Sequence, residues 1–368
     1  MKILVYGAGP LGSVFAAKLH QAGHEVSILA RGQRLSEIRE HGVVIHNIHN
    51  DEWITAPVQV VERLDPDDAY DLVMIIMRKN RIVEILPALA ANHNTPNVLF
   101  MANNAAGPQE WVTALGKERV LTGFPSSAGY RDGHVMQCLT GTVEKPMTIP
   151  IGEVDGQIRE RTQRIAEALS AAPGFAVEIR TDMDAWHKYH VALLMPALAP
   201  ALFACGTDRM RMSRTRDAVV LAIRGVHEGF RVLRAKGVPI TPPSLRMFAR
   251  LPEPIMTALL RFWIRDLKME IALVGHANAA RDELKHLADE FLDIARTTTV
   301  PTPNIERLYS YFDPATPLIP DGSQEIPLDW REVIIGAGAL LGGLLGMAIL
   351  IRSRKAGRQQ RKCNALDF

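Results

Sequence analysis

A glycine-rich turn at the start of the chain places the strongest constraint on the fold. Residues 7–12 read GAGPLG and directly follow the apolar run KILVY. In a strand–turn–helix unit the first glycine permits the tight turn, the second lets a pyrophosphate approach the backbone, and the third lets the helix pack on the strand. The free N–H groups at the helix N-terminus then favour phosphate binding. The motif predicts a Rossmann-type parallel α/β domain in which a dinucleotide contacts Gly7, Ala8, Gly9, Pro10, Leu11 and Gly12.

The second predicted strand, EVSILA, indicates which dinucleotide is bound. An NAD site usually ends this strand with an acidic residue that binds the ribose 2′-hydroxyl, but here the strand runs into Arg31. A guanidinium can pair with a 2′-phosphate through charge-assisted hydrogen bonds. We therefore predict NADP(H), bound by Arg31 with Arg34 as the second candidate. A solvated basic turn is the alternative interpretation.

The order of apolar runs and breakers divides the 368 residues into five segments. Short strands alternate with helices over residues 1–180, and long helical patterns broken by prolines occupy residues 181–312. This order predicts an α/β fold with an all-helical second domain. Residues 313–332 have the composition of a linker, residues 333–351 form an apolar segment, and residues 352–368 form a basic tail.

Composition excludes several classes of function. The formal net charge is +2, and no basic stripe with interleaved aromatics appears outside the tail, so we expect no nucleic-acid partner. The three cysteines are widely spaced and the histidines lack metal-ligand spacing, so neither a disulfide framework nor a metal site is predicted. The N-terminus lacks the pattern of a secretory signal, and we expect the two large domains in the cytoplasm.

The segment from Val333 to Ile351 contains 19 residues without a charged side chain. At 1.5 Å per residue a helix of this length spans roughly 28 Å, close to the hydrocarbon core of a bilayer. Gly338, Gly342 and Gly346 would permit close helix packing. A membrane anchor is the preferred interpretation, and a buried or dimer-swapped helix is the alternative. The six basic residues that follow conflict with cytoplasmic catalytic domains under the positive-inside rule.

Four stretches of the chain together resemble the ketopantoate reductase (2-dehydropantoate 2-reductase) family. They are GAGPLGSVFAAKLHQAGHEVSILARG, the turn from Asn104 to Gly107, the segment beginning WHKY, and VPTPNIERL, and the resemblance covers roughly residues 1–308. It implies a Rossmann domain joined to a helical domain, with NADPH over the edge of the sheet and the keto acid in the cleft between the domains. The helical domain would then hold the substrate and could form a homodimer. The implied reaction is reduction of a 2-keto acid to a 2-hydroxy acid, with ketopantoate to pantoate, in the pathway to pantothenate and coenzyme A, as the first choice.

The resemblance also implies roles for single residues. Lys188, in the W-x-K pattern, matches the family's catalytic lysine and would donate the proton that the developing alkoxide requires. Asn104 matches the asparagine between nicotinamide and substrate, so it would contact both, and Asn103 is the fallback. Glu270 is the first choice for the family's glutamate in the substrate site, and Glu283 is the reserve.

Other positions depart from the family pattern. Arg78, with Lys79 beside it, stands where the family has a lysine after the third strand, so a forked guanidinium replaces a point charge in the expected cofactor contact. Ala192 and Pro196 replace the asparagines expected four and eight residues after Lys188, and both lack a hydrogen-bonding amide. A keto acid other than ketopantoate therefore stays open. So do a membrane-tethered NADP(H)-binding module without turnover and a related dehydrogenase of a hydroxy acid or sugar phosphate, although no cluster of basic residues for a substrate phosphate stands beside Lys188.

Overall fold

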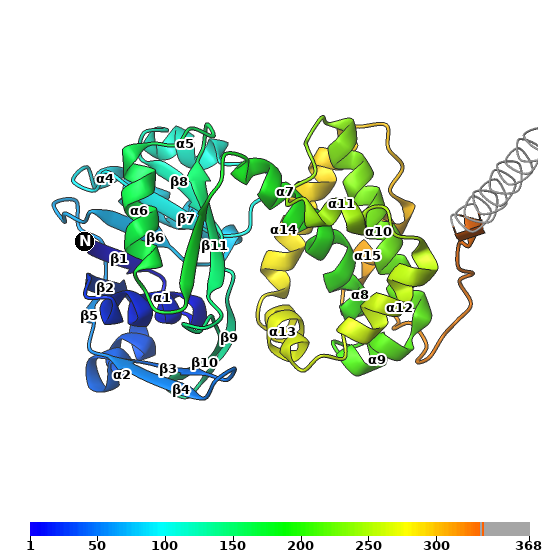
Figure 1. The fold of residues 1–368 in the computed structure, drawn as a ribbon, viewed down its shortest axis with the longest axis horizontal. Coiled ribbons are helices and arrows are strands. Elements are labelled where there is room, and N and C mark those ends of the chain that lie inside the picture. The colour runs from blue at the N-terminus through cyan, green and yellow to red at the C-terminus, as the bar shows by residue number, and fades with distance from the viewer. Residues whose placement is uncertain (332, 335–368) are drawn as a thin grey trace, which may run out of the picture.

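The computed structural model describes residues 1–331 and 333–334, which form two domains joined near residue 180 (Figure 1). The first domain contains a sheet covered by helices on both faces, and the second consists of helices. The predicted α/β class, with a parallel sheet followed by a helical region, is confirmed for these residues.

The main sheet has eight strands in the order β12-β11-β8-β7-β6-β1-β2-β5. Their bounds are β1 Lys2–Tyr6, β2 Glu25–Leu29, β5 Gln59–Val61, β6 Leu72–Ile75, β7 Val98–Met101, β8 Val120–Gly123, β11 Met147–Glu153 and β12 Phe175–Ile179. All neighbours pair in parallel except β11 with β8. The central strands are short, apolar and fully buried, as expected when helices cover both faces. The covering elements are α1 Pro10–Gln21, α2 Gly32–His41, α3 Lys79–Ile82, η1 Val83–Ile85, α4 Leu86–Ala91, α5 Gln109–Leu115 and α6 Glu160–Ser170.

A second, four-stranded sheet lies beside the first, in the order β4-β3-β10-β9. It consists of β3 Val43–Asn47, β4 Glu52–Ala56, β9 Ala128–Asp132 and β10 Val135–Leu139. Strands β3 and β10 pair in parallel although about 90 residues separate them. Helix α1 packs between this sheet and the main one, so the small sheet belongs to the first domain's core.

The second domain is built around α10, Arg216–Ala235, whose buried residues contact most of its neighbours. The surrounding elements are α7 Met183–Leu193, η2 Leu194–Leu198, α8 Ala199–Phe203, α9 Arg209–Arg214, α11 Ser244–Phe248, α12 Glu253–Trp263, η3 Glu270–Gly275, α13 His276–Ala279, α14 Arg281–Arg296, α15 Pro303–Tyr309 and η4 Ser310–Phe312. Segment η2 is a π-helix containing Pro196, which has no N–H to donate to the helical ladder.

Residues 313–331, predicted as a linker, form a strap that is bonded to the helical domain. Asp217, near the N-terminus of α10, accepts the backbone N–H groups of Glu325 and Ile326, each at 2.9 Å. Arg211 donates to the carbonyl of Ile319 at 2.8 Å. The linker composition did not reveal this attachment, because the bonds use the strap's own backbone groups.

The predicted hydrophobic helix from Val333 to Ile351 lies outside the described residues except for its first two positions. Within residues 1–331 and 333–334, no helix is both long enough and apolar enough to cross a membrane.

Candidate active site between the two domains

The glycine turn has the geometry that a dinucleotide requires. Gly7 has a φ of +125°, and a Cβ on it would lie 2.2 Å from the carbonyl oxygen of Ile76. A Cβ on Gly12 would lie 1.8 Å from the carbonyl oxygen of Gly7, so only glycine allows this contact between helix and turn. A Cβ on Gly9 would meet no described atom within 4 Å. The turn is therefore tight against the protein at Gly7 and Gly12 and open at Gly9, where a pyrophosphate would approach.

The two arginines after β2 have different environments. Arg34 is buried and donates to the carbonyl of His134 at 2.9 Å, to Ser13 Oγ at 3.2 Å and to the carbonyl of Ala8 at 3.3 Å. Through Ala8 it stabilises the conformation of the glycine turn. Arg31 precedes α2 with an exposed side chain that donates to the carbonyl of Glu62 at 3.3 Å. Arg31 is thus the better placed to meet a 2′-phosphate.

The structure brings Lys188 to the turn after β7. Asn104 is buried, and its Oδ1 accepts the backbone N–H of Gly107 at 3.0 Å. The Nζ of Lys188 lies 3.7 Å from the position that a Cβ on Gly107 would occupy, and it forms an ion pair with Asp184 one helical turn earlier. Lys188 and the turn from Asn104 to Gly107, which are about 80 positions apart and resemble the family in two separate motifs, therefore lie close together at the carboxyl-terminal edge of the sheet.

A buried ion pair that the sequence did not predict joins the domains at the same place. Glu290 of α14 accepts the backbone N–H groups of Ala105 and Ala106, at 3.1 and 3.3 Å, through one oxygen. Its other oxygen lies 3.2 Å from Nζ of Lys79, whose side chain is 5% exposed. Lys79 was visible in the sequence as the neighbour of Arg78. Glu290 is one of several acidic residues on an amphipathic helix, and nothing in the sequence distinguishes it.

The two candidate glutamates occupy different environments. Glu283, the reserve, is buried, accepts the backbone N–H of Lys79 at 3.0 Å, and lies 3.4 Å from Nε2 of His276. Glu270, the first choice, is half exposed and pairs with Arg209 at 2.7 Å within the helical domain. The geometry favours Glu283 as the carboxylate that faces the sheet domain.

Arg78, predicted to contact the cofactor, reaches across to the helical domain. Its guanidinium lies 3.1 Å from Asp282 at the start of α14 and also donates to the carbonyl of Ala279. About 40% of its side chain is exposed. In this conformation Arg78 therefore joins the domains, beside the Glu283 contact.

Two histidines on α7 flank Lys188 and are held neutral by their surroundings. Burial, with His190 and Lys188 nearby, lowers the pKa of His187 to about 3. Burial, with His276 nearby, lowers the pKa of His190 to about 4. The imidazole of His190 also stacks on Trp186, with ring centroids 5.0 Å apart. Neither group is suited to carry a positive charge near neutral pH.

The departures at Ala192 and Pro196 have a packing explanation. Both residues are buried. The Cβ of Ala192 lies 3.3 Å from the position that a Cβ on Gly229 would occupy, so this face of α7 packs tightly against α10. These two positions belong to the helical core rather than to a polar pocket wall.

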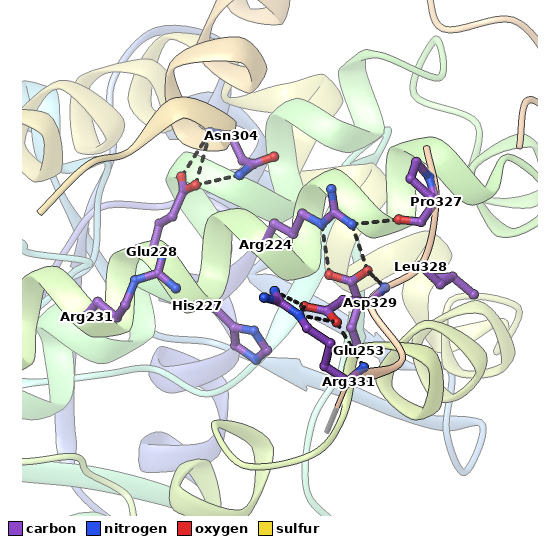
Figure 2. Close-up of a pocket in the computed structure, with 10 residues that line it drawn as sticks. All are labelled: Arg224, His227, Glu228, Arg231, Glu253, Asn304, Pro327, Leu328, Asp329 and Arg331. Carbon is purple, nitrogen blue, oxygen red and sulfur yellow. Dashed lines mark hydrogen bonds and ion pairs between the residues drawn. The ribbon is translucent and has the colours of Figure 1, made fainter. Parts of the chain in front are cut away.

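A cavity of about 600 Å³ lies elsewhere, within the helical domain (Figure 2). Arg224 and Glu253 form a two-bonded ion pair there, and Asp329 of the strap donates its backbone N–H to Glu253 at 2.9 Å. Glu228 accepts the backbone N–H groups of Asn304 and Ile305 at the start of α15. The carboxylates of Glu228 and Glu253 are therefore already used in bonds within the protein, and the bonds of Glu253 and Arg224 around the cavity attach the strap to the helices.

Among the described residues, no group of three or more His, Cys, Asp or Glu is placed to hold a metal ion.

Comparisons with known proteins find similar sequences and similar structures. Residues 3–154 match the sequence profile of ketopantoate reductase PanE/ApbA. A 2-dehydropantoate 2-reductase of Archaeoglobus fulgidus is 24% identical over 287 residues, which cover 77% of this chain and 91% of the relative. One from Mesorhizobium japonicum is 34% identical over 214 residues, covering 51% of this chain and 63% of the relative. The crystal structure of a 2-dehydropantoate 2-reductase from Geobacter metallireducens has a TM-score of 0.70 at 17% identity, covering 86% of this chain and all of that one.

Proposed function

Because this chain belongs to the ketopantoate reductase family, we propose that it is an NADPH-dependent oxidoreductase that reduces the ketone of a 2-keto acid. We propose ketopantoate as the substrate and pantoate as the product, on the route to pantothenate and coenzyme A. The observation that carries the proposal is the position of Lys188 beside the turn from Asn104 to Gly107, at the sheet edge that also carries the glycine turn.

NADPH, when bound, supplies the hydride that reduces C2 of the keto acid. The glycine turn fits its pyrophosphate, because the space at Gly9 is open, and Arg31 fits its 2′-phosphate. As the C2 oxygen gains charge, Lys188 donates a proton to it, and Asp184 keeps the ammonium oriented toward the turn. Asn104 orients the reacting groups, and Glu283 fixes the loop that carries Lys79.

The substrate's carboxylate needs a cationic or N–H partner. Lys79 is a buried cation linked to the Asn104 turn through Glu290, which contacts both the Lys79 ammonium and the N–H of Ala105, and we assign Lys79 to carboxylate binding. A different 2-keto acid is the second candidate, because Ala192 and Pro196 present no amide to a hydroxylated substrate side chain.

The test is NADPH oxidation by the full-length protein with ketopantoate and a panel of other 2-keto acids. We expect Lys188→Ala to lower kcat by about 10²–10⁴-fold, the usual contribution of a positioned general acid. Lys188→Arg keeps the charge and the pair with Asp184 but donates a proton poorly, and serves as the matched control. Turnover unchanged in Lys188→Ala would refute the assigned role. NADPH binding without turnover on any keto acid would instead favour a binding module.

A further inference from the structure

The outward face of α12 is apolar although it is exposed. Ile255, Leu259, Phe262 and Trp263 recur at helical spacing on this face, and Phe262 is 78% exposed. The inward face is also apolar, with Met256, Leu260 and Ile264 buried against the domain. A helix that is apolar on both sides is normally covered on both sides. Together with Leu267, 70% exposed just after the helix, these side chains form a contiguous apolar surface, which we call the α12 face.

Basic residues outnumber acidic ones in the segment that carries the α12 face. Five basic and two acidic residues lie between positions 246 and 268. One of the acidic residues, Glu253, is paired with Arg224 and faces the cavity of Figure 2. Arg265 and Lys268 are exposed beside Phe262 and Leu267. Exposed aromatic and aliphatic side chains rimmed by Arg and Lys are typical of helices that lie in the interface of an anionic membrane.

The strap reaches the N-terminus of α12. The backbone N–H of Asp329 is bonded to Glu253, the first residue of α12, and Arg224 also holds the carbonyl of Pro327 (Figure 2). Trp330 and Ile334, which follow, are exposed. In sequence, the uncharged run that ends at Ile351 and the six basic residues after it continue from this point. Helix α12 and the end of the strap both lie on the side of the helical domain remote from the sheet domain (Figure 1).

We propose that the α12 face docks on the surface of an anionic phospholipid bilayer. Phe262, Trp263 and Leu267 enter the boundary between headgroups and acyl chains, while Arg265 and Lys268 meet lipid phosphates. The strap is bonded through Asp329 to the first residue of the same helix, and Trp330, which follows Asp329, is exposed. Helix α7, which carries Lys188, lies on the side of the helical domain that is next to the sheet domain, away from α12 (Figure 1).

The test uses the full-length protein and vesicles of phosphatidylcholine with or without phosphatidylglycerol. We expect co-sedimentation with the anionic vesicles, weakened by salt, and slower hydrogen exchange in residues 253–268 when the vesicles are present. The double variant Leu259→Glu/Phe262→Glu should lower vesicle affinity at least tenfold. The double variant Val143→Glu/Ile158→Glu is the matched control, since it places the same charges at exposed apolar positions of the first domain. Unchanged NADPH binding verifies that each variant is folded.

Three outcomes would overturn the proposal. The first is the absence of vesicle binding by the unaltered protein. The second is binding that the α12 variant leaves unchanged, with no protection of residues 253–268, which would assign binding to the C-terminal segment alone. The third is a dimer in solution that dissociates in the α12 variant, which would assign the face to a second copy of the chain.

Discussion

The Glu290 contact gives the sharpest test of how the two domains cooperate. In Glu290→Ala the ammonium of Lys79 and the N–H groups of Ala105 and Ala106 lose their shared carboxylate. Breaking a buried pair by removing one partner costs about 3–5 kcal/mol. In this variant the ammonium of Lys79 still has the carboxylate of Glu110 at 3.6 Å, so we use the lower end of this range of costs, about 3 kcal/mol. Because 1.4 kcal/mol corresponds to a factor of ten, opening of this contact should become roughly 100-fold more favourable.

Hydrogen exchange at the amides of Ala105 and Ala106 measures this opening directly. We expect exchange there to accelerate by roughly 100-fold in Glu290→Ala, and by about tenfold in Glu290→Gln, which keeps an acceptor oxygen but loses the charge. The same variants should lower kcat/KM while NADPH affinity changes little, because the glycine turn is untouched. Asp293→Asn, which removes the exposed pair with Arg296 on the same helix, is the control and should have almost no effect. Unchanged exchange at Ala105 and Ala106 in Glu290→Ala would refute the reasoning.

Three further predictions concern separate parts of the molecule. Gly9→Ala should leave the thermal midpoint of unfolding unchanged but weaken NADPH binding, measured by titration, at least tenfold. Gly12→Ala should destabilise the protein even without NADPH, because its Cβ would meet the carbonyl of Gly7. The pKa of His187 is lower in the folded protein than in the unfolded chain, so the unfolded chain binds more protons between about pH 3 and 6.5. The free energy of unfolding should therefore fall by about 1.4 kcal/mol per pH unit as the pH decreases below 6.5. Urea unfolding of His187→Asn should lack this pH-dependent loss of stability. Asp217→Ala should cost at least about 2 kcal/mol and speed proteolysis within residues 313–331, while Asp321→Asn, whose pair with Arg214 is half exposed, should change neither by much.

The parts of the site that lie on local sequence patterns were predictable. The glycine turn could be located because the spacing of Gly7, Gly9 and Gly12 encodes short-range sterics, and the structure shows the contacts that those sterics imply. Lys188 and Asn104 came from resemblance to a family rather than from physics, and their proximity could not be derived from periodicity. Their roles stay predictions until the variants are measured.

The features that sequence reasoning missed depend on long-range pairing. The small sheet joins β3 to β10 across about 90 residues, and neither strand carries a turn signal that points to the other. Glu290 and Lys79 are ordinary surface residue types, and they become a buried pair only because α14 packs against the edge of the sheet. Lys and Glu are mostly exposed in proteins and are almost never fully buried unless they are paired, so the sequence alone predicts that both residues lie on the surface.

The positions of Ala192 and Pro196 change where the substrate's polar contacts must come from. In the sequence these positions lack two hydrogen-bonding groups that the family has on the helix of Lys188. In the structure both are buried core residues, and Ala192 packs closely against Gly229. Polar contacts to the substrate must then come from the sheet edge and from α13 and α14. Asn103 meets this requirement: it is buried next to Asn104, and its Oδ1 has no hydrogen-bond partner among the described residues. A buried acceptor without a partner costs about 1–3 kcal/mol, which a donor group on the bound substrate would recover. A keto acid that carries a hydroxyl group, as ketopantoate does, is therefore compatible with this site despite the loss of both asparagines.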